Sequence, residues 1–397
     1  MRNLYLALLT AFALTACAPA EEPMESVYKR GMEVAVAQGK AMAKQLENQA
    51  GKLPRSAKDG KLITSGFRWW CSGFFPGELW YLYEYNKDPE LLRMAEMYTK
   101  RVENVQYITS NHDVGFMLYC SYGNGYRITQ REDYKKVLVQ GARSLSTRYS
   151  PKTKTIQSWG SNRVWQYPVI IDNMMNLELL TWAGKATGEK FFTDIAVNHA
   201  NTTIKHHFRP DYSSYHVVSY DTVTGLPHKK QTHQGYSDDS DWSRGQSWGL
   251  YGYTMMYRET GKKEYLEHAR HIAAFLMNNP NMPADKIPYW DYKCPDIPNT
   301  TRDASAAAVM ASGLLELAHL DVIPAKERES YRKYAEDQLR SMTSPEYLAN
   351  PGENNNFVLK HSTGYFKGNS EVDAPLSYAD YYYVEALMRW KKWFGKN

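Results

Sequence analysis

Apolar side chains recur at three- and four-residue spacing along most of the chain. This period is typical of amphipathic α-helices, in which every third or fourth residue faces the core. Strand-like alternation does not recur, so the pattern predicts a mostly α-helical protein. The helical stretches are Met32–Leu46, Leu92–Val105, Tyr134–Leu145, Asn173–Trp182, Leu250–Tyr257, Tyr265–Met277, Ala306–Leu320 and Tyr331–Met342.

A similar connector joins successive helices. In each copy one helix ends in a turn former and the next begins a few residues later. Helical hairpins of this kind cannot bury their apolar faces alone, which favours a closed ring of paired helices, an all-α barrel. A solenoid is the alternative, but inserts of unequal length disfavour it. The connectors are Tyr85–Pro89, Ile128–Tyr134, Ala186–Phe191, Glu259–Tyr265 and, less regular, Val322–Glu327.

Long irregular inserts separate the hairpins and are rich in Trp, His, Asp and Gly. Loops with such residues usually form the functional face of a protein. No linker divides the chain, so we expect one domain. The inserts are Gly66–Gly77, Ile108–Gly115, Ile156–Asp172, Arg209–Gly249, Asn281–Asp303 and Asn350–Pro375.

Aromatic residues make up 14% of the 397 residues, and 31 of them are Tyr. Their rings can fill a large helical core, and they can also stack on sugar rings. The formal net charge is +5 and no long Lys/Arg run is present, so the charge gives no support for nucleic-acid binding.

The amino terminus resembles a bacterial lipoprotein signal. An apolar run from Leu4 to Leu14 leads to small residues and Cys17, and it is too short to span a membrane. We expect a signal peptide over residues 1–16, lipid on Cys17, a tether over residues 17–26 and one catalytic domain over residues 27–397. An ordinary secretory signal is the alternative. The expected location is the periplasm or cell surface of a Gram-negative bacterium, with lipid as the only membrane contact.

The other cysteines are Cys71, Cys120 and Cys294, an odd number that does not fit a disulfide scaffold. None lies in a CxxC motif. We interpret all three as small buried apolar residues.

Two aspartates each adjoin an apolar run. Asp113 precedes Val114–Met117, and Asp172 lies between Ile170–Ile171 and Met174–Met175. A pair of carboxyl groups beside apolar surface can separate into one ionised and one protonated group, as acid/base chemistry on a sugar requires. The alternative for either residue is a helix N-cap.

The run Thr232–Gly249 holds one His, three Asp, one Arg and two Trp. It lacks the closing bidentate Glu of a calcium loop, so we predict neither a metal nor a cofactor. A sugar site fits better, with Trp242 and Trp248 as stacking faces, Arg244 gripping a carboxylate and Gln234 bonding hydroxyls. A polar loop without a ligand is the alternative.

Seven motifs in order resemble the unsaturated glucuronyl hydrolases, glycoside hydrolase family 88. They span nearly all of the chain after the signal: Trp70–Gly77, His112–Phe116, Ile156–Gly160, Ile171–Asn176, Ser213–Val217, Thr232–Trp248 and Tyr378–Tyr382. The resemblance implies an (α/α)6 barrel that removes the unsaturated uronic acid which polysaccharide lyases leave at the non-reducing end of oligosaccharides.

The resemblance also implies roles for single residues. Asp172 resembles the family's general acid/base and Asp113 its second essential carboxylate. The residues that resemble its substrate contacts are Trp70, His112, Trp159, His216, Gln234, Arg244 and Trp248.

The chemistry calls for a protonated carboxyl group. The unsaturated ring is an enol ether, so protonation at C4 develops positive charge at C5, water adds there, and the resulting hemiketal opens. Asp172 must therefore hold a proton near neutral pH, and we expect its apolar neighbours and an ionised Asp113 to raise its pKa. The partner is an unsaturated uronate-containing oligosaccharide, whose parent polysaccharide is not specified by these motifs.

Two other functions are compatible with the sequence. An unsaturated rhamnogalacturonyl hydrolase would share the barrel and the hydration chemistry but would prefer rhamnose at the next position. A noncatalytic glycan-binding surface lipoprotein would tolerate the loss of either aspartate.

Overall fold

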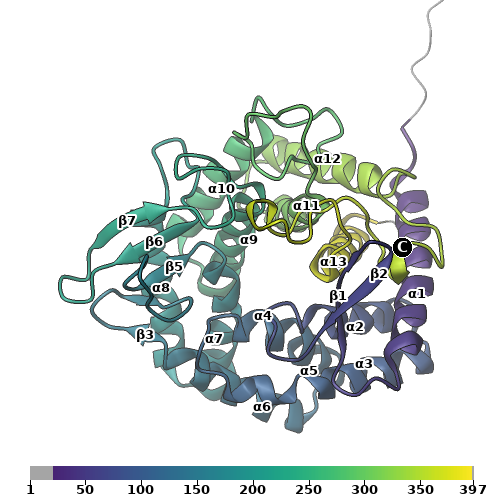
Figure 1. Ribbon diagram of the computed structural model, residues 1–397, viewed down its shortest axis with the longest axis horizontal. Helices are drawn as coiled ribbons and strands as arrows, with labels where there is room; N and C mark the ends of the chain where they lie inside the picture. Colours follow the sequence, from purple (N-terminus) through teal and green to yellow (C-terminus); the bar gives the residue numbers. More distant parts are fainter. Residues whose placement is uncertain (1–20, 396–397) are drawn as a thin grey trace, which may run out of the picture.

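A computed structural model describes residues 21–395, which form a ring of helices in two layers (Figure 1). The outer helices are α1 (Met24–Leu46), α3 (Pro89–Arg101), α6 (Glu132–Ser146), α8 (Lys190–His207), α10 (Lys263–Met277) and α12 (Ala325–Met342). The inner helices are α2 (Phe74–Asn86), α7 (Asn173–Thr187), α9 (Ser243–Thr260), α11 (Ala304–His319) and α13 (Ser377–Phe394). The sixth inner position holds α4 (Val114–Leu118), a π-turn over Tyr119–Gly123 and α5 (Asn124–Thr129). This arrangement is the predicted (α/α)6 barrel.

The eight predicted helical stretches lie in α1, α3, α6, α7, α9, α10, α11 and α12, although Leu92–Val105 continues past α3 into a 3₁₀ segment. The connectors also end helices as predicted, since Gly188 and Gly261 close α7 and α9 at positive φ of 76° and 68°. Three long helices, α2, α8 and α13, were not predicted, because their sequences have no clear apolar stripe. Inner helices α2 and α13 are buried on most sides, and α8 buries His199, Thr203 and His207 in its core-facing stripe.

The protein is mostly α-helical, as predicted, and it also contains a few short strands. Hairpins are formed by β1 (Leu53–Lys58) with β2 (Lys61–Ser65) and by β3 (Tyr149–Ser150) with β4 (Thr155–Ile156). An antiparallel sheet is formed by β5 (Pro168–Ile170), β6 (Val217–Tyr220) and β7 (Pro227–Gln231). These strands have two to six residues, too few for a periodic signal.

Each of the six long inserts leads into an inner helix, and the starts of these helices meet. The rings of Phe74 (α2) and Tyr378 (α13) lie 5.9 Å apart, and Phe116 (α4) donates its backbone N–H to Asn176 (α7). The inserts therefore gather at one end of the barrel, as expected for a functional face.

The amino-terminal predictions fall mostly outside the described residues. The signal peptide and Cys17 lie there, whereas Met24–Ser26 of the predicted tether belong to α1, so the domain begins earlier than residue 27. Glu22 already contacts the barrel, with Oε2 2.8 Å from Arg30 Nη2. Cys71, Cys120 and Cys294 are buried free thiols, as predicted.

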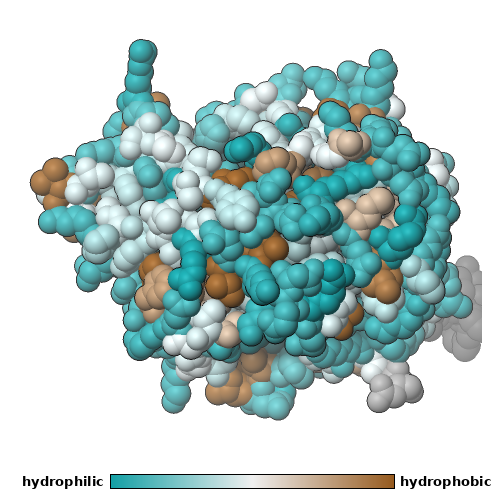
Figure 2. Space-filling view, turned by 90° about the horizontal axis from the view of Figure 1, so that it is seen from below, coloured by the Kyte–Doolittle hydropathy of each residue, from teal (hydrophilic) through white to brown (hydrophobic). Residues whose placement is uncertain are grey.

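Between residues 21 and 395, no helix has the length and apolar character needed to cross a membrane. Figure 2 shows one face of the molecule, on which hydrophilic side chains dominate and hydrophobic ones form small separate groups.

Candidate active site

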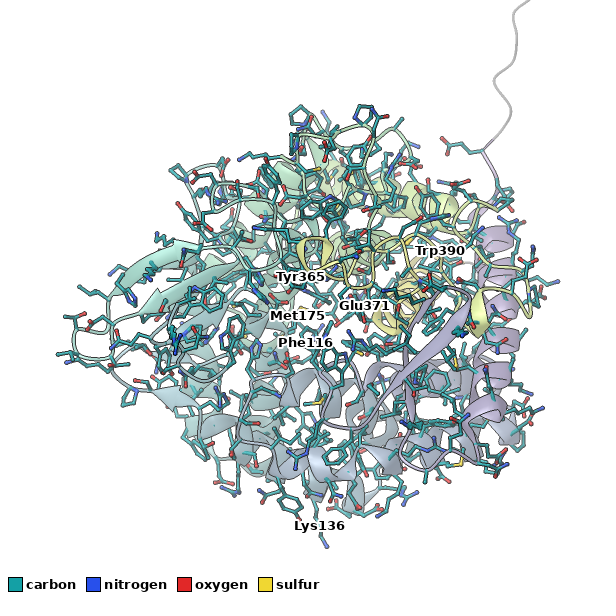
Figure 3. All side chains as sticks on the ribbon, viewed as in Figure 1. Phe116, Lys136, Met175, Tyr365, Glu371 and Trp390 are labelled. Atoms are coloured by element: carbon teal, nitrogen blue, oxygen red, sulfur yellow. The ribbon has the colours of Figure 1, made fainter. Side chains whose placement is uncertain are left out.

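Asp113 and Asp172 directly precede two inner helices that touch. A Cβ on Gly115 would lie 2.5 Å from Asn176 Cα, so glycine permits the close approach of α4 and α7. Phe116 and Met175, which follow the two aspartates, lie near the middle of the ring (Figure 3). Neither aspartate accepts a capping hydrogen bond through its side chain, so the helix-cap alternative does not account for them.

The small sheet places His216 beside Asp172. Ile170 of β5 pairs with Val217 of β6, and the next residue, Ile171, donates its N–H to the carbonyl of His216. His216 Nε2 then lies 3.6 Å from Asp172 Oδ2.

The tautomer of His216 follows from its other nitrogen. Nδ1 accepts the backbone N–H groups of His233 and Gln234, each at 3.0 Å. Burial lowers the pKa of His216 well below its usual value, so the ring is neutral and its one hydrogen is on Nε2. His216 therefore presents an N–H to Asp172.

His112 occupies the matching position beside Asp113. Its backbone N–H donates to Ser158, and its Nε2 lies 3.3 Å from Asp113 Oδ1. Burial lowers the pKa of His112 to about 3, which keeps the ring neutral. Both carboxyl groups thus have a neutral imidazole as their nearest titratable neighbour.

Burial raises the pKa of Asp172 to about 7. The charges of Arg244 and Asp113 act on it in opposite directions, Arg244 lowering and Asp113 raising its pKa. The direction of the shift of Asp172 is the predicted one, and burial is its largest cause. Burial also raises the pKa of Asp113 to about 7, against the opposing charge of Arg148, so Asp113 is not the plainly ionised partner that we expected. Two carboxyl groups that titrate together near neutrality hold about one proton between them at pH 7.

Several buried polar atoms around the two carboxyl groups lack a protein partner. Buried polar atoms are nearly always hydrogen-bonded, so such a cluster marks the place of a polar ligand or of water. The atoms are Asp172 Oδ2, His216 Nε2, His112 Nδ1, Asn173 Oδ1 and Trp248 Nε1.

Arg244, the predicted carboxylate-binding residue, already has several partners within the protein. Its Nη1 donates to Asp303 and to the carbonyl of Thr363, and its Nη2 donates to the carbonyl of Gly364. The residue is only 1% exposed, so three of its five N–H groups are engaged within the protein. Its positive charge still acts on Asp172, and two N–H groups remain.

The two tryptophans of the Thr232–Gly249 run are packed inside the protein and do not offer exposed faces for stacking. Trp248 has no exposed surface, and its ring packs against Phe116 at 5.1 Å and Tyr382 at 5.4 Å. Only its indole N–H acts on Asp172, whose pKa it lowers. Trp242 is 3% exposed and lies under His216, so the stacking predicted for both residues is not seen.

The other predicted contacts surround the carboxyl groups. Trp70 is half-buried and lies 4.7 Å from the ring of Tyr378. Trp159 is half-buried at the edge of the site, 5.5 Å from Trp165. Gln234 donates its side-chain N–H to the carbonyl of Gly364 at 3.0 Å.

No group of three His, Cys, Asp or Glu residues between positions 21 and 395 is arranged to hold a metal ion.

Comparison with known proteins agrees with this geometry. The profile of Glycosyl Hydrolase Family 88 matches residues 38–395. This chain belongs to glycosyl hydrolase family 88. It is 45% identical, over 81% of its length and 79% of the relative, to an unsaturated glucuronyl hydrolase of Formosa agariphila.

Solved structures of family 88 enzymes share the barrel. An unsaturated glucuronyl hydrolase specific for heparin is 50% identical, with a TM-score of 0.89 over 93% of this chain and 98% of that one. A mutant of the Streptococcus agalactiae enzyme complexed with dGlcA-GalNAc6S is 29% identical, with a TM-score of 0.78 over 94% and 92% of the two chains.

Three residues of this family 88 site were not predicted as site residues, although His233 lies within the Thr232–Gly249 run. His233 and Tyr365 face each other at the rim, with ring centroids 4.9 Å apart, but Tyr365 lies in an insert without a pattern. Asp303 pairs with Arg244 across 59 residues. Such contacts form only when the ring of helices closes, and the spacing of residues along the sequence does not specify them.

Proposed function

We propose that this family 88 hydrolase removes the 4,5-unsaturated uronic acid from the non-reducing end of lyase-generated oligosaccharides. The observation that carries the proposal is the paired placement of Asp113 and Asp172, each buried and each with its pKa raised to about 7. A carboxyl group of this pKa can deliver a proton at neutral pH and then take one back.

Asp172 acts first as the acid. Its proton goes to C4 of the enol ether, and the electron pair of the double bond forms the new C–H bond, which leaves oxocarbenium character at C5. A water molecule then adds its oxygen to C5 and returns one proton to Asp172. The hemiketal opens to a ketone at C5. The glycosidic bond at C1 then breaks and releases the next sugar. Asp113 stabilises the positive charge on the ring.

The surrounding neutral donors fix the geometry. His216 Nε2–H and the indole N–H of Trp248 are buried, make no close hydrogen bond to a described residue, and both act on the Asp172 carboxyl group. Donors that are already oriented stabilise charge without reorganising during the reaction. Arg244 contributes its charge and its two remaining N–H groups toward the uronate carboxylate.

We infer that the parent polymer is a glycosaminoglycan. One similar structure is described as specific for heparin, and another is complexed with dGlcA-GalNAc6S. A panel of unsaturated disaccharides from heparin, chondroitin and pectin tests this choice. Turnover confined to the rhamnose-containing pectin product would contradict it and favour a rhamnogalacturonyl hydrolase.

The role of Asp172 is tested by loss of the ultraviolet absorbance of the conjugated double bond. Asp172→Asn should slow this loss by at least about a hundredfold, the lower range for a positioned proton donor. Asp321→Asn, at an exposed position, is the matched control and should leave the rate unchanged. A near wild-type rate for Asp172→Asn would refute the assignment.

We also propose that lipid on Cys17 anchors the enzyme to a membrane facing the periplasm or the cell surface. The support is the lipoprotein-like signal at residues 1–17. Expression of the full chain with radiolabelled palmitate should label the wild type and not Cys17→Ala. Equal labelling of both proteins would exclude this anchor.

A further inference from the structure

A second cavity extends along the barrel axis beyond the two carboxyl groups. It has a volume of about 660 Å³ and is lined by Met175, Glu178 and Trp182 of α7 and by side chains of α9 and α13. Trp182 lies ten residues after Asp172, which at 1.5 Å per helical residue is about 15 Å along α7. The rings of Phe116 and Tyr382 line this cavity, and both pack against Trp248, whose indole N–H acts on Asp172. Phe116 and Met175, which line this cavity, lie near the middle of the ring in Figure 3.

The charged side chains of the cavity neutralise one another. Both oxygens of Glu316 bind Arg258 Nη1 at 2.8 Å, and Arg389 Nη1 binds the same carboxylate at 2.9 Å. Arg127 forms two bonds of 2.8 and 2.6 Å with Glu84. Because these charges are paired, the cavity has no strong preference for an ion of either sign.

Other polar groups of the cavity are available. The hydroxyls of Tyr119 and Tyr126 make no hydrogen bond to another described residue, and both rings lie against Trp182, with centroids 6.2 and 5.5 Å away. Glu178 binds Arg258 through Oε1, while Oε2 makes no hydrogen bond to another described residue. Trp182 itself is half-buried, so part of its surface stays accessible.

We propose that this cavity, here called the axial pocket, binds a neutral saccharide of one or two rings. Aromatic side chains offer flat apolar faces to sugar rings. The free phenol groups and the carboxylate oxygen of Glu178 can accept and donate hydrogen bonds to sugar hydroxyls. The volume falls in the range of small-molecule sites. Because the arginines of the cavity are already paired with glutamates, a charged ligand would find no free counterion among them, and a neutral ligand fits best.

The test measures binding of cellobiose, N-acetylglucosamine, glucuronate and choline to the full chain by saturation-transfer NMR and tryptophan fluorescence. Cellobiose or N-acetylglucosamine should bind the wild type with a Kd at or below about 10 mM. Trp182→Ala should weaken this binding at least about tenfold, corresponding to about 1.4 kcal/mol. The matched control Trp69→Ala, at a tryptophan 38% exposed and outside the pocket, should not change it.

Tyr126→Phe removes only one hydroxyl and keeps the test decisive if Trp182→Ala does not fold. It should weaken sugar binding about threefold while leaving the melting temperature unchanged. The proposal is overturned if neither neutral sugar binds, if binding is insensitive to both variants, or if glucuronate or choline binds more tightly than the neutral sugars at a site that Trp182→Ala weakens. None of these readouts depends on hydrolysis, so they separate the axial pocket from the reaction at Asp172.

Discussion

Arg244 and Asp303 form a buried ion pair, with 2.7 Å between Nη1 and Oδ2 and both side chains at most 1% exposed. The same Asp303 accepts the N–H of Ser305 at the start of α11, and the same Arg244 binds the carbonyls of Thr363 and Gly364. The pair therefore joins α9, α11 and the loop before α13 around the site.

Asp303→Asn should destabilise the protein strongly. The substitution keeps the shape but leaves the Arg244 charge buried without a counterion, which costs about 3–5 kcal/mol. Chemical denaturation measures the loss, and Asp321→Asn, in an exposed pair with Arg328, should change the free energy of unfolding by less than about 0.5 kcal/mol. A loss below about 1 kcal/mol for Asp303→Asn would show that the pair does not hold the loop.

Gly115→Ala should separate the two helices that carry the carboxyl groups. The new Cβ would meet the backbone of Asn176 at 2.5 Å, so α4 or α7 must shift. We expect a loss of about 1–3 kcal/mol in stability together with reduced kcat. Gly313→Ala is the matched control, because its Cβ would make ordinary contacts from 3.4 Å, and unchanged activity in both variants would argue against the close approach.

Trp248→Phe should move the alkaline limb of the kcat/KM profile to higher pH. The indole N–H lowers the pKa of Asp172, so its removal raises that pKa and keeps the acid protonated at higher pH. Trp80→Phe removes an indole hydrogen bond to Thr99 in the core and serves as the control. A shift of the limb to lower pH in Trp248→Phe, or an equal shift in the control, would contradict this role.

The Asp172→Asn variant should gain stability relative to the wild type as the pH rises. Burial lifts the pKa of Asp172 from 3.8 to about 7, so between these values the native state retains a proton that the unfolded state has released. The wild type therefore loses stability from about pH 4 to pH 7, on the order of 4 kcal/mol at about 1.4 kcal/mol per pKa unit. Melting curves at pH 4 and pH 8 measure the difference, and an equal difference at both would mean that Asp172 titrates normally.

The sequence predicts most of the barrel because outer helices expose one face and bury the other. Helix α6, with Tyr134, Val137 and Leu138 buried and charged residues outside, is such a case. Inner helix α13 buries Ser377 through Leu387 without interruption and was not predicted from its spacing, whereas α11, buried without interruption from Ala304 to Ala318, was predicted. The motif Tyr378–Tyr382 of α13 is found only by resemblance.

The sequence predicts the two carboxyl groups of the candidate site, but it does not predict the contacts of the residues that support them. Asp113 and Asp172 each adjoin an apolar run, which is a local signal. Whether Arg244 is free or engaged depends on Asp303, Thr363 and Gly364, which only the closed ring brings to it. Residue type alone therefore predicted its charge but not its partners.

The central claim is that Asp172 delivers a proton to C4 of the unsaturated ring. The most direct measurement is the deuterium content of the product formed in D₂O from an unsaturated glycosaminoglycan disaccharide, determined by NMR. The wild type should give a 4-deoxy keto acid with one deuterium added at C4, and Asp172→Asn should give none beyond the uncatalysed reaction. A product that keeps its C4=C5 double bond, or full C4 deuteration by Asp172→Asn at the wild-type rate, would contradict the account.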